Sequence, residues 1–584
     1  MKYPFLNEIA TTQQVTDVFT GLNLNARIAE GAMCEELNIC SDNYPVLSTR
    51  PFRSEVTQLS NCLGMLSKKQ LAWVDGTRLL FGGEDLTPNL TAKGITLSGA
   101  KKQLVSMGAY IVIFPDKVYI NTEDFTDCGF LEAHTSMDAS IAVQPCMADG
   151  DGITFPSGAT PPANPESGAY WLDTSGEKHA LKVYSAATEL WTAVSPTYVK
   201  LSYPGIGGGF STDDAVEISG LSGSDELSGL NGSHLLIRCE EDSIVIIGLV
   251  SAEAVATAIK VDRSVPELDY VCEAQNRLWG CFYGMGKDGK VLNEIYACAL
   301  GDFKNWRRYS GISTDSYTAS IGSDGAWTGC ATVQGYPTFF KEECLHKVFV
   351  SSTGAHQIVE TKCRGVQRGC SKSVSELDGY LYYKSQDGVY VYDGSLPKCI
   401  SGALGRFTGS DAVGGSVGGK YYICMNLSGA GEMSGHRLLC YDTTNGIWSA
   451  EDEIAVTDMQ RLGDCLYFAG DGKLWCNKAG MGEAETAALQ WSARTGIIGY
   501  ADTNQKYISR IVIRAKFKGT MQIHIAYDGG EEEYYGSAGS VGLRSFVFPI
   551  APRRCDHFQM RLSGTGDAQI FSISKIYESG SDVS

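Results

Sequence analysis

Residues 71–81 read LAWVDGTRLLF, two apolar runs on either side of Asp75 and Gly76. An Asp-Gly pair suits a tight turn with positive φ, and apolar runs that flank such a turn predict a β-hairpin. Similar stretches recur as YIVIFPDKVYIN at 110–121, YLYYKSQDGVYVY at 380–392 and LYFAGDGKLWC at 466–476. The chain is therefore expected to be built largely from hairpins.

The spacing of these hairpins predicts their arrangement. They start at residues 71 and 110 and again at 337, 380, 421 and 466, in steps of 39, 43, 41 and 45 residues. A repeat of about 40–50 residues with four strands per unit is typical of β-propeller blades. Residues 51–132 and 263–485 supply material for six or seven blades at about 45 residues each, and six is the favoured number.

The stretch 133–262 interrupts this rhythm and is expected to be an insertion. Residues 150–199 contain a Pro/Gly/Ser-rich lead-in and a small Trp/Tyr module, and residues 200–250 or so predict a small β-barrel. The insertion holds 17 acidic and 5 basic residues, a net charge of −12 out of −19 for the whole chain.

The two ends of the chain differ from the propeller. Residues 1–50 lack strong periodicity and suggest an arm or strap. Residues 486–584 predict a β-sandwich, because stretches such as ISRIVIRAKFK at 508–518 alternate apolar and polar side chains. That segment has 11 basic and 9 acidic residues, a net charge of +2.

Composition narrows the function classes. A net charge of −19 argues against nucleic-acid binding by charge neutralisation, although DNA could pass such a surface without adhering. The N-terminus shows no secretory signal, and no apolar run has the ~18 residues of a membrane span. The 19 cysteines form no CxxC motif, so we expect reduced, mostly buried thiols.

Motifs for catalysis or metal binding do not emerge from the sequence. Residues 414–420, GGSVGGK, match a phosphate-binding pattern, but Tyr421 replaces the Ser or Thr that holds Mg²⁺, and a strand follows. A glycine-rich turn between strands is therefore expected there, with the charge of Lys420 solvated. The eight histidines show no metal-ligand spacing. We expect no catalytic residue, metal or cofactor, and no enzyme activity.

Three aromatic side chains of the insertion allow two interpretations. Trp171, Tyr184 and Trp191 could form a platform that stacks against a sugar ring. They could equally be the core of a very small domain, which is the commoner role of such residues.

Several segments carry a family resemblance. CSDNYPVLSTRPFR (40–53), NEIYACALGDFKNW (293–306) and PRRCDHFQMRLSGTGDAQIFSISKIYESGSDV (552–583) resemble tail proteins of bacteriophages. The similarity is closest to nozzle and packaged-DNA stabilisation (tail hub) proteins. The Trp/Tyr module is similar to small modules of phage tail and fibre proteins.

The resemblance implies a structural virion protein of the phage tail, assembled in the host cytoplasm. It implies a homo-oligomeric ring or nozzle that closes the tail and conducts DNA during ejection. The partners would be copies of itself and other tail proteins such as adaptor and fibres, while DNA passes without specific binding. The alternative is a tail-tip propeller protein that binds or cleaves host surface glycan.

A ring needs two complementary patches on each subunit. The largest basic feature of the sequence is the polar side of residues 508–518, and two arginines near 553 could extend it. The candidate assembly face therefore comprises Arg510, Arg514, Lys516, Lys518, Arg553 and Arg554. A solvated strand face is the alternative, since surface charge pairs add little energy.

Overall fold

A computed structural model describes residues 11–286, 289–350, 355–428, 433–485, 488–499, 504–550 and 553–579. Strands dominate this part of the chain, and its helices are single turns. They are α1 (Thr87–Ala92), α2 (Asp225–Ser228), η1 (Ser371–Ser373) and η2 (Gly402–Leu404). In the described ranges, no helix has the length and apolar character that crossing a membrane requires.

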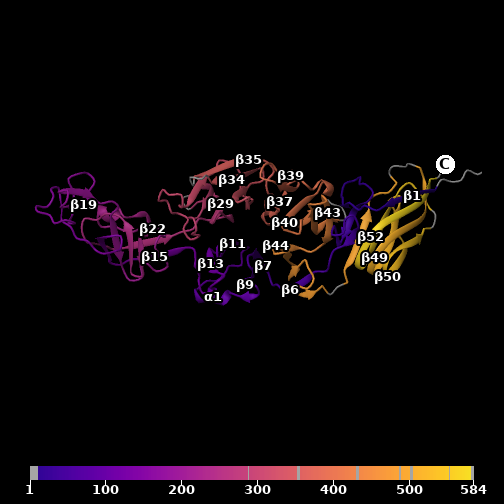
Figure 1. The fold of residues 1–584 in the computed structure, drawn as a ribbon, viewed down its shortest axis with the longest axis horizontal. Helices are drawn as coiled ribbons and strands as arrows, with labels where there is room; N and C mark the ends of the chain where they lie inside the picture. Colours follow the sequence, from indigo (N-terminus) through magenta and orange to yellow (C-terminus); the bar gives the residue numbers. More distant parts are fainter. Residues whose placement is uncertain are drawn as a thin grey trace, which may run out of the picture.

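The molecule is elongated and has three parts along its long axis (Figure 1). The insertion lies at one end, the propeller occupies the middle, and the C-terminal sheet lies at the other end beside the chain terminus. All three parts are built from β-sheets, so the expectation of an all-β protein is confirmed.

The propeller consists of seven small meander sheets within the described residues. Blades 1 to 3 are β7 (Cys62–Ser67), β8 (Leu71–Asp75), β9 (Arg78–Phe81) and β10 (Glu84–Asp85); β11 (Gln103–Met107), β12 (Tyr110–Phe114), β13 (Val118–Asn121) and β14 (Cys128–Phe130); and β28 (Tyr270–Ala274), β29 (Arg277–Met285), β30 (Val291–Ala297) and β31 (Tyr317–Ser320). Blades 4 and 5 are β32 (Gly329–Val333), β33 (Tyr336–Phe340), β34 (Cys344–Val350) and β35 (His356–Lys362); and β36 (Ser375–Leu377), β37 (Tyr380–Ser385), β38 (Gly388–Tyr392) and β39 (Lys398–Cys399). Blades 6 and 7 are β40 (Thr408–Val417), β41 (Lys420–Ser428), β42 (Gly435–Asp442) and β43 (Ile447–Asp452); and β44 (Val456–Leu462), β45 (Cys465–Gly470), β46 (Lys473–Cys476), β6 (Ser54–Gln58) and β47 (Glu483–Ala484).

The blades close into a ring. Contacts link the first strand of one blade to the first strand of the next, from β7 through β11, β28 and β32, and from β36 through β40 and β44 back to β7. Blades 4 and 5 share one apolar core, in which Val333 and Phe340 meet Leu381. The blade number is therefore seven, the larger of the two numbers that the hairpin spacing allowed.

The favoured number of six is therefore wrong, and the seventh blade is the one that closes the ring. Its fourth strand, β6, comes from upstream of the first hairpin and pairs antiparallel with β46, so that Gln58 lies opposite Lys473, and β47 pairs with the other edge of β6. Hairpin spacing does not show which strand closes the ring, because β6 lies upstream of the first hairpin.

The quoted hairpin forms as predicted, with the turn shifted by one residue. All five residues of β8 are buried, and Asp75 pairs with Arg78, so the turn is made by Gly76 and Thr77. Gly76 has φ of +63°. The Asp75 carboxylate accepts hydrogen bonds from the backbone N–H groups of Ser60 and Asn61, at 2.9 and 2.6 Å. This carboxylate therefore fixes the loop that enters blade 1.

The insertion begins and ends on adjacent strands. β15 (Ala133–Met137) pairs with β27 (Ile259–Arg263), so that Ala133 lies opposite Arg263. Two small sheets pack on one core that includes Ile141, Leu201 and Val261. Their other strands are β16 (Ile141–Cys146), β21 (Tyr198–Ser202), β22 (Ala215–Ser219), β23 (Gly232–Leu235), β24 (Arg238–Glu240), β25 (Ser243–Ile247) and β26 (Ala254–Ala256). This β-module draws strands from residues 133–146 as well as from the stretch near 200–250.

A second, smaller sheet is the Trp/Tyr module. It consists of β17 (Ser157–Gly158), β18 (Tyr170–Asp173), β19 (Ala180–Ser185) and β20 (Leu190–Ala193). It leaves the β-module after β16 and returns at β21, and it lies at the far end of the molecule (Figure 1).

Because entry and exit strands are paired, the insertion can be removed with a short bridge. We expect deletion of residues 133–262, replaced by a Gly/Ser bridge, to leave a soluble, folded propeller with net charge −7 instead of −19. Circular dichroism and thermal unfolding of the purified variant would check this. Loss of soluble expression would show that the insertion is part of the propeller's folding core.

The C-terminal part is one ten-stranded sheet that curls around its own core. Its long strands are β49 (Lys506–Tyr527), β50 (Glu532–Pro549) and β52 (Phe558–Ser579), joined by β48 (Gln490–Thr495) and β51 (Arg554–Cys555). The predicted sandwich is thus a single sheet whose long strands run through both layers.

A glycine corner allows these strands to bend. At Gly519, Gly564 and Gly566, an added Cβ would lie 1.9 Å from the carbonyl oxygen of the residue on the facing strand. Gly519 and Gly566 also have positive φ values of +124° and +84°. Strands that turn from one layer into the other need such close backbone approach, which only glycine permits.

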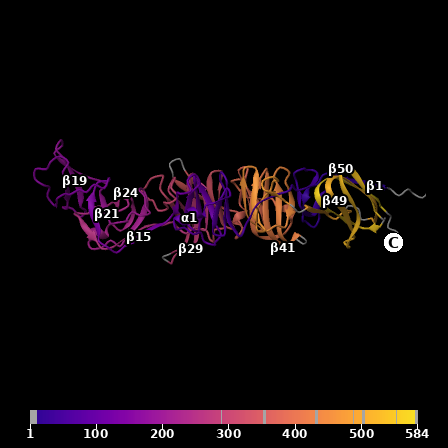
Figure 2. The ribbon, with the colours of Figure 1, turned by 90° about the horizontal axis from the view of Figure 1, so that it is seen from below.

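The N-terminal strap completes this sheet and touches the propeller. β1 (Thr11–Thr16) pairs with β52, and β3 (Ala32–Leu37) pairs with β48. The strap's other strands are β2 (Gly21–Leu22), β4 (Ile39–Cys40) and β5 (Leu47–Thr49), and β2, β3 and β4 contact β43 of blade 6. Figure 2 shows the indigo strap between the propeller and the C-terminal sheet.

Candidate functional site

Three buried polar residues join the insertion to the propeller, and we call Asp214, Arg263 and Asn305 the insertion joint. All three are at most 4 % exposed. Arg263 forms an ion pair with Asp214, and its Nε donates to the Leu131 carbonyl oxygen at 3.0 Å. Asn305, beside blade 3, accepts from the Ala215 N–H at 2.8 Å and donates to Asp214 at 3.2 Å. These bonds fix the insertion's direction relative to the propeller.

A second cluster lies where the strap enters the propeller, and we call Arg50, Arg53, Glu451, Asp452 and Glu485 the strap joint. Arg50 forms a bidentate pair with Glu485, at 2.9 and 3.0 Å. Arg53 contacts Glu451 at 2.5 Å and also pairs with Asp452. Burial by itself would lower the pKa of Arg53, but Asp452 and Glu451 raise it well above its usual value. The Arg53 guanidinium therefore stays ionised.

Glu36 lies in the same region, and none of the residues that the structure describes pairs with it as a cation. The side chain is on β3, is 2 % exposed, and accepts one hydrogen bond from the Ala450 N–H at 3.1 Å. Its other oxygen has no partner within the described residues. Burial raises the pKa of Glu36 to about 8, although the bond from Ala450 opposes the shift. The carboxyl is therefore held largely in its neutral form at neutral pH.

This burial predicts a pH dependence of stability. In the unfolded chain Glu36 ionises near the ordinary glutamate pKa of 4.5, whereas the folded protein retains the proton until about pH 8. The contribution of Glu36 to the free energy of unfolding is complete below pH 4.5. Between pH 4.5 and about 8 it falls by about 1.4 kcal/mol per pH unit. We expect Glu36→Gln to gain stability relative to the parent as pH rises from 5 to 8, measured by denaturant unfolding. A pH-independent difference would contradict this.

The glycine-rich motif at 414–420 forms the expected turn. Gly418 and Gly419, both with positive φ, connect β40 to β41. Lys420 was expected to be solvated, and that expectation is wrong: the residue is 9 % exposed and forms an ion pair with Asp42 of the strap. Together with Arg50 and Arg53 it lines a cleft of about 260 Å³. The lysine thus belongs to the contact between strap and propeller.

The three predicted aromatics of the Trp/Tyr module come together. Trp191 lies between Trp171 and Tyr184, with ring centroids 5.4 and 5.3 Å away. Trp171 is 4 % exposed, and its indole N–H donates to the Gly158 carbonyl oxygen at 3.1 Å. Trp171 is therefore the core of this small sheet, while Trp191 and Tyr184 are half-buried.

The predicted basic side chains also share one surface. Arg510, Arg514, Lys516 and Lys518 are all exposed on one side of β49, opposite the buried Ile511, Ile513, Ala515 and Phe517. We call these four cations the basic face. Arg553 instead pairs with Glu533 and lies over the Tyr527 ring, and Arg554 lies over Tyr507. These two arginines make local contacts within the C-terminal sheet.

A larger cleft, of about 490 Å³, opens where the chain leaves the insertion for blade 3. Its lining includes residues 264–267 together with Phe282, Tyr296 and Arg307. Sequence patterns gave no signal for this cleft, because its walls come from an irregular linker and the strands of one blade.

Comparisons with known proteins bear on the fold alone. No family model matches the chain, and no curated protein matches it. Among solved structures, an exo-β-1,3-galactanase from Phanerochaete chrysosporium is 9 % identical, with a TM-score of 0.21 over 52 % of this chain and 94 % of that chain. A glycoside hydrolase family 43 arabinoxylan arabinofuranohydrolase from Bacillus subtilis is 9 % identical, with a TM-score of 0.17 over 53 % and 94 %. The phage phi92 endosialidase is 12 % identical, with a TM-score of 0.14 over 82 % and 56 %. At these values the likenesses support no inference about activity.

Proposed function

We propose that the chain is a structural subunit of a bacteriophage tail that assembles with copies of itself into a ring or nozzle around the path of the DNA. The observation that carries this proposal is where the tail-like segments lie. The segment 40–53 contains Arg50 and Arg53 of the strap joint, 293–306 contains Asn305 of the insertion joint, and 552–583 contains β52. The segments that resemble tail proteins are therefore those that hold the parts of the molecule together.

The joints suit a component under mechanical load. Each part has its own β-sheet core. The parts are connected by buried, hydrogen-bonded charges and not by flexible linkers alone. A buried pair resists separation because removing one partner leaves the other charge without compensation in a poorly solvated place. A rigid rod of this kind can transmit force along its axis.

Charge distribution supports assembly through unlike surfaces. The insertion, with net charge −12, and the C-terminal sheet, with its basic face, lie at opposite ends of the molecule (Figure 1). A heterologous contact between two different patches closes into a ring when its rotation permits. The acidic surplus of the chain would also let DNA phosphates pass without adhering.

Electron microscopy tests the proposal directly. Negatively stained particles of the purified full chain should include rings with a central opening, and antibodies against the chain should label phage tails. Particles that remain monomeric at all accessible concentrations, together with unlabelled tails, would overturn the proposal.

The basic face gives a sharper prediction for assembly. Reversal of Arg510, Arg514 and Lys516 to Glu should preserve the fold, because all three side chains are exposed, but should impair ring formation, most strongly at low salt. A matched control reverses the exposed Lys93, Lys101 and Lys178, which changes the net charge equally. Mass photometry of both variants across a salt series provides the measurement. Equal assembly of the two variants would remove the basic face from the interface.

Glycan binding is the second candidate, favoured by the 490 Å³ cleft beside blade 3. Its aromatic walls, with Phe282 and Tyr296, and the nearby Arg307 are groups that stack against and hydrogen-bond sugars. Binding on a bacterial surface-glycan array that Tyr296→Ala abolishes would favour this function. An array without signal, combined with ring particles, would favour the structural one.

A further inference from the structure

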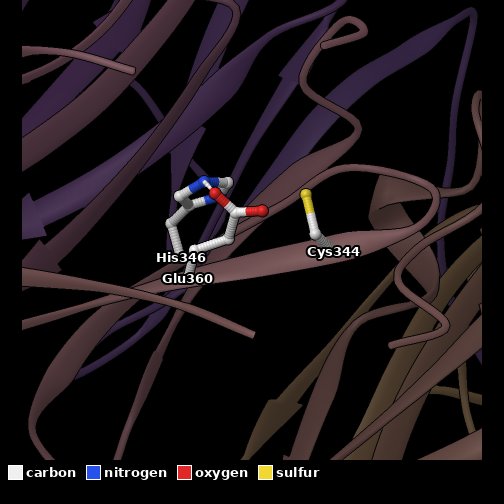
Figure 3. A group of neighbouring side chains, drawn as sticks. All are labelled: Cys344, His346 and Glu360. Atoms are coloured by element: carbon white, nitrogen blue, oxygen red, sulfur yellow. Dashed lines mark ion pairs between the residues drawn. The ribbon is translucent and has the colours of Figure 1, made fainter. Parts of the chain in front are cut away.

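Blade 4 carries three potential metal ligands on one side of two neighbouring strands (Figure 3). Cys344 and His346 are two residues apart on β34, so their side chains point to the same face of the blade. Glu360 on β35 lies directly opposite His346 in the antiparallel register. One ligand atom from each of the three residues lies within 4.8 Å of the other two.

We propose that Cys344, His346 and Glu360 bind a divalent transition-metal ion of the zinc class. This inference is independent of the proposed tail function. In the described part of the chain, no other group of three such side chains meets the same separation.

The donor set selects the class of metal. Thiolate sulfur, imidazole nitrogen and carboxylate oxygen are the ligands of Zn²⁺ and of Co²⁺ as its substitute, at roughly 2.0–2.3 Å. Ca²⁺ and Mg²⁺ prefer six or more oxygen ligands, which this cluster lacks. Ligand atoms around a tetrahedral zinc are on the order of 3.5 Å apart, so closing a 4.8 Å spacing requires only small side-chain rotations.

His346 supplies an observation independent of the spacing. The residue is 1 % exposed, yet its Nδ1 has no hydrogen-bond partner within the described residues. Its Nε2 lies 3.2 Å from the Ser323 Oγ and 3.6 Å from a Glu360 carboxylate oxygen. Burial lowers the pKa of His346, although Glu360 opposes the shift, so the ring is neutral and keeps a lone pair for coordination.

The contacts of the neighbouring Lys341 lie outside the cluster. Two lysines act on Cys344: Lys341, and Lys362, which lies opposite it on β35. The Nζ of Lys341 donates to the Ser323 carbonyl oxygen at 2.7 Å and to Asn293 at 3.2 Å, and it lies over the Trp327 ring. None of these contacts uses a ligand atom. Burial raises the pKa of the Cys344 thiol, so metal binding would release one proton as the thiolate forms.

Cobalt binding to the full chain, dialysed free of metal, tests the proposal. We expect one equivalent of Co²⁺ to bind and to produce the near-ultraviolet thiolate-to-cobalt charge-transfer band, and Zn²⁺ but not Ca²⁺ to displace it. Cys344→Ser should abolish the band, whereas Cys399→Ser, which removes an exposed thiol elsewhere, should retain it.

A second variant separates loss of a ligand from misfolding. Glu360 is partly exposed, so Glu360→Gln should fold normally and still weaken Co²⁺ binding by at least about tenfold, as measured by titration calorimetry. A band that persists in Cys344→Ser, unchanged affinity in Glu360→Gln, or no stoichiometric binding by the parent would each overturn the proposal.

Discussion

Arg53→Met should destabilise the protein by about 3–5 kcal/mol. The arginine is 3 % exposed and compensates two carboxylates, Glu451 and Asp452, on the outer strand of blade 6. Methionine fills a similar volume but carries no charge, so Glu451 would stay buried without its arginine partner, and the half-buried Asp452 would keep only Arg50, 3.8 Å away. Since Arg53 directly precedes β6, the loss should loosen both blade 6 and the closure of blade 7.

Hydrogen exchange and denaturant unfolding provide the measurement. We expect faster exchange in β43 and β6 and an earlier unfolding transition. The control is Arg78→Met, because Arg78 pairs with Asp85 on the surface with 55 % of its side chain exposed, and its loss should change stability by less than about 1 kcal/mol. Equal effects of the two variants would show that the strap joint adds no more than a surface pair.

Gly564→Ala should strongly disrupt the C-terminal sheet although it adds a single methyl group. The new Cβ would lie 1.9 Å from the Thr520 carbonyl oxygen, a distance that requires the two long strands to separate. Because β49 and β52 are paired along their whole length, the strain cannot be relieved at one residue. We expect a loss of about 3 kcal/mol or more, at the upper end of overpacking effects.

A glycine of the same sheet serves as the control. Gly539 on β50 has no heavy atom within 4 Å of an added Cβ and no positive φ, so Gly539→Ala should be nearly neutral. Thermal unfolding and limited proteolysis of both variants would check the difference. Normal stability of Gly564→Ala would mean that the corner can relax and that the bend does not depend on glycine.

Local patterns predicted the hairpins because a hairpin is specified by neighbouring residues. The apolar runs of β37 and β38, or of β45 and β46, and the turn between them lie within about a dozen positions. The all-β propeller followed from their spacing. The closure by β6 did not, because its partner Lys473 is 415 positions away from Gln58.

The insertion joint and the strap joint could not be predicted from the sequence for a related reason. Asp214, Arg263 and Asn305 stand in unrelated contexts in the sequence, and only folding brings their side chains together. Lys420 was assigned to solvent because its own turn is glycine-rich, while the group that buries it, Asp42, comes from the strap. By contrast, the basic face was visible in advance, because period-2 alternation places every second residue of β49 on one side.

The threading of both chain ends through the fold has a consequence for biosynthesis. The strap pairs with residues up to 567 positions downstream, as Thr11 does with Glu578. Strand β6 likewise has no partner until β46 has been synthesised. A ribosome must therefore release almost the entire polypeptide before either edge is covered, and until then those unpaired strand edges can join neighbouring nascent chains. Slow, late closure of this kind makes the yield of native protein sensitive to synthesis rate, temperature and chaperone supply. Truncated products should aggregate instead of accumulating as soluble fragments.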